Sequence, residues 1–201
     1  MGKIKVVALY GKAGSGKDTV LHELIKMGAT YNFNEIISCT TRPPREGEIN
    51  HVNYHFLTNE EFTEQVLNGD MLEATEFNNW FYGTPLLSLD PNKINIGVFN
   101  IAGLEALIED SRVEVFPIEV WTSDKERMLR QLNREEKPNV EEICRRFFAD
   151  QKDFVNWELS REIEWEEAIF YVNNSDGHLN TIIPMILDLI TDFSRGSYIG
   201  L

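Results

Sequence analysis

A glycine-rich segment near the N-terminus has the composition of a phosphate-binding loop. Residues 11–17 read Gly-Lys-Ala-Gly-Ser-Gly-Lys and fit the pattern G-x-x-x-x-G-K. Glycines let the backbone curl so that successive amide N–H groups point at phosphate oxygens, and the lysine adds a full positive charge. A strand before the segment and a helix after it favour this interpretation over a connector that binds nothing. We expect a nucleoside triphosphate, with ATP as the phosphoryl donor, to contact Gly11, Ala13, Gly14, Ser15, Gly16, Lys17, Asp18 and Thr19.

The residue after Lys17 departs from the usual form of this loop. Serine or threonine normally stands there and contacts Mg²⁺, whereas this chain has Asp18 followed by Thr19. The Asp18 carboxylate either approaches the metal, directly or through water, or serves only as a favourable acid in the first turn of the helix. Both interpretations stay open, and Asp18 is the one candidate metal ligand.

The residues around the loop predict an α/β fold with a mainly parallel central sheet. Residues 3–10 are β-branched and apolar, as in a central strand buried on both faces, and residues 17–27 have helical spacing up to Gly28. Residues 94–100 and 113–121 return to strand-like character around a helix from about 104 to 109, the spacing of a right-handed crossover. The phosphate loop would then follow the central strand.

Further elements are indicated by caps and turns. Capping pairs open three helices, a hairpin turns at Asn78-Asn79, and a short strand and an apolar-faced helix close the chain. The pairs are Thr58 with Glu61, Ser123 with Glu126, and Asn139 with Glu142, and the segments are 54–57, 71–77, 80–84, 170–173 and 179–193.

A polar, proline-containing loop at residues 40–50 carries a second set of candidate residues. It begins Thr-Thr-Arg-Pro-Pro-Arg and is followed by Tyr54-His55-Phe56, Glu73 and Tyr82-Gly83-Thr84-Pro85. In this order and spacing the chain resembles the guanylate kinase family, closely to about residue 85 and more weakly over 130–151 and at 172–173. The resemblance implies a P-loop NTPase fold of three layers, α/β/α, with a small region that binds a nucleoside monophosphate and a helical lid.

The resemblance also implies an acceptor site. The acceptor phosphate would be held by Arg42, Arg45, Tyr54 and Tyr82, and the base would be read by Ser38, Glu73 and Thr84. Guanine presents adjacent N–H donors to a carboxylate and a carbonyl to a hydroxyl, whereas adenine would leave Glu73 unpaired at a cost of about 1–3 kcal/mol. Taken singly, the tyrosines fit strand packing and Glu73 fits a solvent-facing strand position.

One feature departs from the family's pattern. An acidic pair follows the fourth core strand in the family, where this chain has Phe99-Asn100-Ile101-Ala102. Asn100 can hydrogen-bond a base or ribose but carries no charge. Strict guanine selectivity and the family's arrangement of Mg²⁺ are therefore both open.

Arginines after residue 126 resemble those of the family's lid. Arg130 and Arg134 lie one helical turn apart, and Arg145 or Arg146 follows on the next helix. We expect Arg130 to contact ATP, and Lys17, Arg45, Arg134 and Arg146 to act on the transferring phosphoryl group, with no general base. A solvated, ion-paired surface is the expectation for Arg127, Arg145 and Arg161.

These features predict one domain of 201 residues with guanylate kinase activity on GMP or dGMP, using ATP and Mg²⁺. Its core would be 1–37, 94–125 and 160–201, its acceptor region 38–93 and its lid about 126–158. The alternatives are a deoxynucleoside monophosphate kinase of broader base range, and a non-catalytic protein-interaction module. The intact phosphate loop argues against the non-catalytic interaction module.

Composition limits the partners. The net charge of −14 disfavours nucleic acid and anionic membranes, so small-molecule nucleotides are the expected partners. Cys39 and Cys144 have no metal-like spacing and are expected to be free thiols. With no signal-peptide pattern or long apolar run, a reducing cytoplasmic location is expected; oligomeric state is not predicted.

Overall fold

A five-stranded parallel sheet forms the centre of the computed structural model, which describes residues 2–45, 47–77, 79–134, 136–160, 169–175 and 178–196. The strand order is β2-β7-β1-β8-β9, and every pairing is parallel. The strands are β1 (Ile4–Tyr10), β2 (Phe33–Glu35), β7 (Ile94–Val98), β8 (Val113–Trp121) and β9 (Phe170–Asn173). The prediction that the first strand is central is confirmed.

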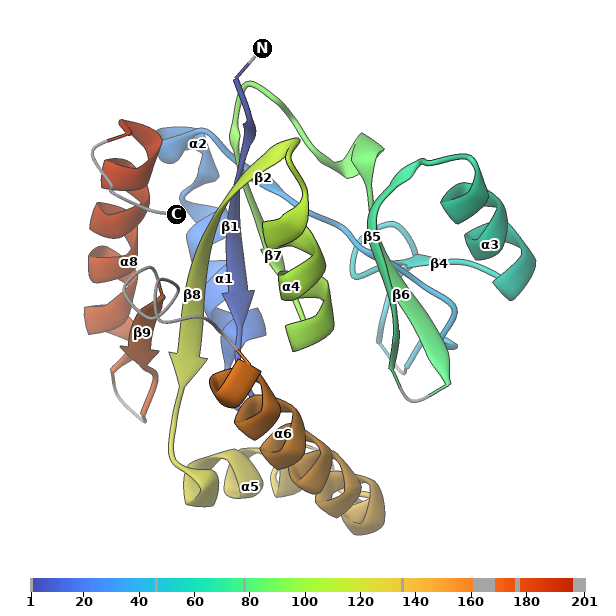
Figure 1. Ribbon diagram of the computed structural model, residues 1–201. Helices are drawn as coiled ribbons and strands as arrows, with labels where there is room; N and C mark the ends of the chain where they lie inside the picture. The colour runs from blue at the N-terminus through green and yellow to red at the C-terminus, as the bar shows by residue number, and fades with distance from the viewer. Residues whose placement is uncertain are drawn as a thin grey trace.

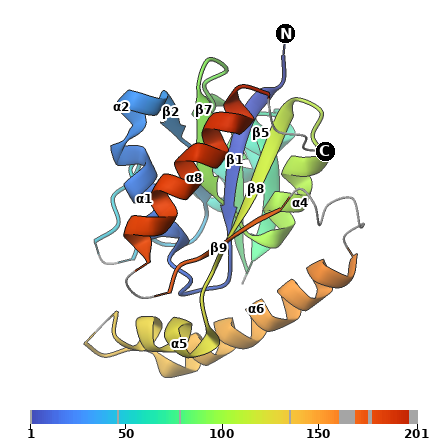
Figure 2. The ribbon, with the colours of Figure 1, turned by 90° about the vertical axis from the view of Figure 1, so that its left-hand side faces the viewer.

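Helices cover both faces of this sheet, which gives the expected three layers (Figures 1 and 2). Because side chains alternate along β1, Val7 and Leu9 enter the core on one face and Val6, Ala8 and Tyr10 enter the core on the other. The first core includes α1 (Lys17–Lys26) and α8 (Leu179–Ser194); the second includes α4 (Ile101–Glu109) and α6 (Val140–Ser160).

A second, smaller sheet stands beside the central one (Figure 1). Its order is β4-β3-β6-β5, with β3 (Cys39–Thr40), β4 (His55–Phe56), β5 (Met71–Phe77) and β6 (Trp80–Pro85). Helix α3 (Asn59–Leu67) packs on it through Phe62 and begins at the capping box predicted at Thr58 and Glu61. The hairpin of β5 and β6 is confirmed, although Asn78 of its turn lies outside the described residues.

Two predicted helix boundaries differ from the structure for local reasons. The first helix, α1, ends at Lys26, within one residue of the prediction, but Gly28 opens the short helix α2 (Gly28–Tyr31), after which Asn32 takes the left-handed position with φ 57°. Helix α4 begins at Ile101, earlier than predicted, because the Asn100 side chain accepts a hydrogen bond from the Gly103 N–H at 2.7 Å.

The remaining elements are η1 (Leu86–Ser88) and α5 (Asp124–Leu132). The Ser123 hydroxyl caps α5 by accepting from the Glu126 N–H, and Asn139 caps α6 through the Glu142 N–H, as their spacing predicted. Within the described residues no helix is both long and apolar enough to span a membrane.

Candidate active site

The phosphate loop lies at the carboxyl end of β1, between β1 and α1. Gly14 and Gly16 adopt left-handed backbone conformations, with φ 81° and 89°. A Cβ on Gly14 would lie 2.6 Å from the Arg127 carbonyl oxygen, and one on Gly16 would lie 2.3 Å from Asn174 Nδ2. Both positions therefore require glycine for two reasons: the backbone has a positive φ, and a side chain would collide with neighbouring atoms.

The loop is tied to its surroundings through carbonyl groups. Ser15 O accepts hydrogen bonds from Arg130 Nη1 at 3.2 Å and from Asn174 Nδ2 at 2.9 Å, while Arg130 Nη2 donates to Asn174 O at 2.7 Å. Phosphates are bound by the amide side of such a loop. Arg130, which we expected to contact ATP, thus lies against the loop backbone, and its contact with the nucleotide stays a prediction.

Asp18 and Thr19 are exposed on the first turn of α1, next to a half-buried Lys17. Burial, with the negative charge of Asp18 as the next cause, raises the pKa of Tyr54 to about 12. Tyr54 directly precedes β4 of the second sheet, so Asp18 lies within electrostatic reach of one predicted acceptor residue. Among the described residues no group of three or more His, Cys, Asp or Glu side chains is arranged to hold a metal.

Arg42, Tyr54 and Tyr82, three of the residues predicted to hold an acceptor phosphate, lie together at the second sheet. The Arg42 guanidinium lies 5.5 Å from the centre of the Tyr54 ring, and the two tyrosine rings meet edge-on at 6.3 Å. Arg42 is 9% exposed and makes a two-point ion pair with Glu48, both N···O distances being 2.9 Å. A buried cation in a fork-shaped contact is the geometry that binds carboxylate or phosphate.

Glu73 and Thr84 form a buried polar pair beside this group. The Thr84 hydroxyl donates to Glu73 Oε1 at 2.8 Å, and neither residue is more than 8% exposed. Burial raises the pKa of Glu73 to about 7, although the hydrogen bonds from Thr84 act in the opposite direction. A Cβ on Gly103 would lie 3.3 Å from Glu73 Oε2, so this carboxyl group faces the N-terminus of α4.

Two other predicted acceptor residues have structural contacts of their own. The Asn100 amide donates to Thr75 Oγ1 at 3.4 Å while its oxygen caps α4. Ser38 directly precedes β3, and its carbonyl accepts from the His55 N–H at 2.9 Å. Their contacts with a base remain predictions.

Arginines from three segments approach one another. Burial lowers the pKa of Arg146, and the positive charges of Arg45 and Arg134 lower it further. Arg45 comes from the proline-containing loop, Arg134 follows α5, and Arg146 lies on α6. Asp150 and Glu142 act in the opposite direction, so the three arginines lie among two carboxylates. An excess of positive charge of this kind suits a multiply charged anion. Arg145, in contrast, is exposed and paired with Glu142 at 2.6 Å, as expected.

The expectation for Arg127 was wrong. Its side chain is 1% exposed, and it pairs with Asp124 at 2.8 Å and with Asp150 at 3.2 Å. The polar sequence of α5 suggested a solvated face, but α6 packs over it and buries the guanidinium. Asp150 and Asn174, which also touch the loop, had no recognisable signal in the sequence. Arg161, also expected on the surface, lies outside the described residues.

A phosphate loop after the central strand of a parallel sheet, beside a second sheet with a buried arginine and a buried carboxyl–hydroxyl pair, is the arrangement of the P-loop nucleoside monophosphate kinases. The family model described as guanylate kinase matches residues 3–158. The chain belongs to the guanylate kinase family.

Individual relatives of the chain point to the same family. The guanylate kinase of Malacoplasma penetrans (strain HF-2) is 34% identical over 151 residues, which cover 72% of this chain and 68% of the relative. The guanylate kinase of Prochlorococcus marinus (strain MIT 9312) is 35% identical over 186 residues, 90% of this chain and 96% of the relative. A crystal structure of guanylate kinase from Anaplasma phagocytophilum has a TM-score of 0.66 at 21% identity, covering 99% of this chain and 88% of that one, and so supports the fold.

Proposed function

We propose that this chain is a guanylate kinase that transfers the γ-phosphoryl group of ATP to GMP or dGMP. The observation that carries the proposal is the Glu73–Thr84 pair, buried beside the arginine and tyrosines that suit a phosphate. The pair offers a carboxylate acceptor and a hydroxyl, which match the adjacent N–H donors and the carbonyl of guanine.

The transfer is an exchange of one P–O bond for another. An oxygen of the GMP phosphate bonds to the γ-phosphorus of ATP, and the bond from that phosphorus to the β–γ bridging oxygen breaks, giving GDP and ADP. The acceptor phosphate is already anionic, so no general base is required. Arg42 and Arg45 would fix it, while Lys17, Arg134 and Arg146 would bind the transferring group.

Mg²⁺ fits this site as a partner of the nucleotide phosphates. The ion usually keeps several waters and binds one or two protein carboxylates besides phosphate oxygens, and the exposed Asp18 carboxylate at the end of the loop meets that requirement. When bound, Mg²⁺ would neutralise charge on the β- and γ-phosphates. Asp18 would hold it directly or through water.

The first test is a pair of neighbouring arginine variants. Arg146→Ala should lower kcat by on the order of 100-fold, because it removes a cation from the transferring group. Arg145→Ala is the matched control, since this arginine is exposed and paired with Glu142. Lys17→Ala and Arg45→Ala should lower turnover as strongly, and full turnover in either would overturn the proposal.

The second test is a panel of acceptors in a coupled assay with ATP. GMP and dGMP should be phosphorylated faster than AMP, dTMP and dCMP, because only guanine satisfies Glu73 and Thr84 together. If GMP and dGMP were the poorest acceptors, the proposal would fall.

A kinase of broader deoxynucleotide range is the second candidate. It is favoured by Asn100, which is uncharged and whose oxygen already caps α4. The same panel separates it from the first, since comparable rates on dGMP and dTMP would support the broader range. A non-catalytic interaction module would bind neither ATP nor GMP in a calorimetric titration.

The free thiols Cys39 and Cys144 support the expected cytoplasmic location.

A further inference from the structure

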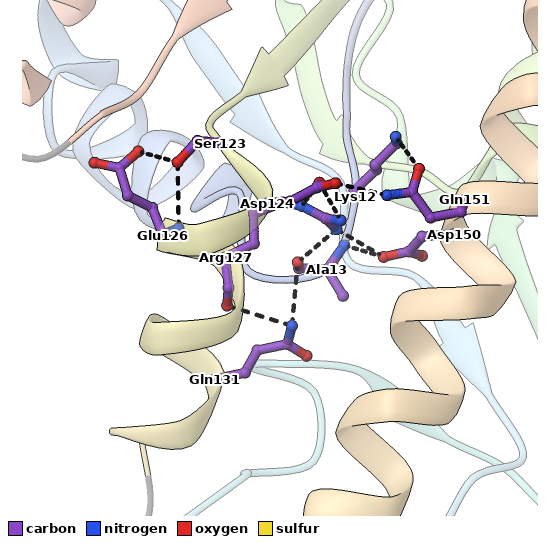
Figure 3. Close-up of polar contacts among 9 residues, drawn as sticks. All are labelled: Lys12, Ala13, Ser123, Asp124, Glu126, Arg127, Gln131, Asp150 and Gln151. Carbon is purple, nitrogen blue, oxygen red and sulfur yellow. Dashed lines mark hydrogen bonds and ion pairs between the residues drawn. The ribbon is translucent and has the colours of Figure 1, made fainter.

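Ala13, in the first half of the phosphate loop, is held at both of its backbone polar groups. Its N–H donates to Asp150 Oδ2 at 2.6 Å, and its carbonyl accepts from Arg127 Nη1 at 3.2 Å and, at 3.4 Å, from Gln131 Nε2. Arg127 Nη1 also donates to Asp150 Oδ2 at 3.2 Å, which closes a triangle of contacts (Figure 3). The loop, α5 and α6 therefore meet at one residue.

The two charged members of the triangle are shielded from water. The Arg127 side chain is 1% exposed and that of Asp150 is 16% exposed. Arg127 is further held by Asp124 and lies 4.9 Å from the centre of the Phe147 ring on α6. Buried charges are tolerated only when paired and hydrogen-bonded, so this geometry is strongly specified, unlike that of an exposed ion pair.

Neighbouring side chains reinforce the contact. Lys12 Nζ donates to Gln151 Oε1 at 2.8 Å, and Gln151 Nε2 donates to Asp124 Oδ2 at 2.8 Å. Asp150 and Gln151 are adjacent on α6 and reach adjacent residues of the loop, as Figure 3 shows. Two consecutive loop residues are thus anchored to the same turn of one helix.

Fixing the Ala13 carbonyl also fixes the direction of the next amide. In a trans peptide the C=O and the following N–H point in opposite directions. Because Arg127 holds Ala13 O on the side of α5, the Gly14 N–H points away from α5. The same relation holds two peptides further on, where Arg130 and Asn174 bind Ser15 O and so direct the Gly16 N–H.

We propose that Asp150 and Arg127 are positioning residues for the donor nucleotide. Through the Ala13 peptide they hold the first half of the loop so that the Gly14 N–H faces the donor phosphates before ATP arrives, while the Ala13 N–H stays on Asp150. The proposal rests on the proposed function, in which this loop binds ATP. The proposal predicts that the affinity for ATP depends on α6, the helix whose N-terminal half carries Arg146.

Steady-state kinetics of Asp150→Ala and Asp150→Asn test the proposal. We expect the KM for ATP to rise by about tenfold or more in Asp150→Ala, the loss expected for one charge-assisted hydrogen bond, with the KM for GMP nearly unchanged. Asp150→Asn keeps an oxygen acceptor for the Ala13 N–H and should show a smaller rise. The matched control is Glu158→Gln, which changes an exposed carboxylate of the same helix. Equal KM values for ATP in Asp150→Ala and wild type would overturn the proposal.

A double variant separates positioning from simple stability. Arg127→Met alone leaves Asp150 buried without its cation and should lower the melting temperature. Adding Asp150→Asn removes the unpaired charge and should recover part of that loss, but it does not restore the Arg127 donor to Ala13 O, which leaves only the longer contact from Gln131 among the described donors. The KM for ATP should therefore stay raised in the double variant. If it returned to the wild-type value along with stability, the role would be structural only.

Hydrogen exchange at the Ala13 amide gives a readout that does not depend on activity. The exchange rate in the protein without nucleotide should rise at least about tenfold in Asp150→Ala, because the N–H loses its acceptor. An unchanged rate would overturn the proposal even if the enzyme were inactive. If wild type failed to phosphorylate GMP while the Ala13 amide behaved as described, the proposed function would fail and the contact would stand.

Discussion

Glu73 and Arg42 are both buried charged residues of the acceptor site, but their partners differ in kind. Arg42 faces the ionised Glu48 in a two-point contact, so its charge is compensated within the free protein. Glu73 has a neutral hydroxyl as its partner, and burial raises its pKa from 4.5 to about 7. The free site therefore holds a carboxylate whose charge a ligand with two N–H donors would stabilise.

This raised pKa predicts a pH dependence for the acceptor. Only the ionised carboxylate accepts both guanine N–H groups, so the KM for GMP should rise by about tenfold as pH falls from 8 to 6. The KM for ATP should change far less. Because the GMP phosphate also titrates near pH 6, Glu73→Gln is the control. In Glu73→Gln the KM for GMP should be high at every pH and should change only with the ionisation of the GMP phosphate. If the wild-type KM showed the same pH dependence as this variant, the assignment of Glu73 to the base would be contradicted.

The same residue predicts a stability that falls with rising pH. The folded state holds the Glu73 proton up to about pH 7, whereas the unfolded chain releases it near 4.5. The stabilising contribution is therefore complete below about pH 4.5 and is lost through pH 7, by at most about 3 kcal/mol. Glu73→Gln should raise the free energy of unfolding at pH 8 and have little effect at pH 4.5, as measured by urea denaturation at the two pH values. A loss of stability at pH 8 would show that the charge is compensated in the folded state.

At the level of elements, α6 joins two different environments. Phe154 and Trp157 are 5% and 4% exposed and belong to the core formed with β1 and α4. Nearer its N-terminus, Arg146 approaches Arg45 and Arg134. We infer that any closing motion of the predicted lid involves the part of α6 before Asp150, because moving the rest would expose apolar side chains.

Two phenylalanines of α6 test this division. Phe154→Ala should lower the free energy of unfolding by about 3–5 kcal/mol, because it leaves a cavity in the core. Phe148 is 70% exposed, and Phe148→Ala should change stability by less than about 0.5 kcal/mol. Chemical denaturation of both variants measures the difference. Similar losses at the two positions would mean that α6 does not sit on the core as described.

How much the sequence predicted depended on whether the cause was local. The apolar run of β1, the capping box at Thr58 and the hairpin depend on neighbouring residues and were correct. The burial of Arg127 was missed because its partners, Ala13 and Asp150, lie 114 and 23 residues away. No periodicity within α5 contains that information. The acceptor residues were found only because their joint order resembled a family.

At the level of the whole molecule, an acidic chain brings three of its arginines together at one place. The net charge is −14, yet Arg45 from the acceptor lobe and Arg134 and Arg146 from the predicted lid lie close enough to lower the pKa of Arg146. Asp150 and Glu142 offset part of this repulsion, and what remains weakens the contact between the two parts in the free protein. Phosphates placed among the three arginines would remove it, so the parts should be held together best when donor and acceptor sites are filled at once.

A single molecule in which adenosine and guanosine are joined through five phosphates should therefore stabilise the fold more than ATP and GMP added together. A ligand present at 100 times its Kd adds about 2.7 kcal/mol to the free energy of unfolding, which corresponds to roughly 5–10 °C in Tm for a chain of this length. Linking the two nucleotides also removes the entropic cost of binding the second nucleotide. The same stabilisation should therefore be reached at a lower concentration of the linked molecule than of the separate nucleotides. Arg146→Ala should abolish most of the advantage of the linked molecule while retaining the smaller stabilisation by ATP alone, and Arg145→Ala should retain both. If the linked molecule gave no more than ATP alone in wild type, the two sites would not be occupied together, and the convergence of the arginines would have to be explained by packing alone.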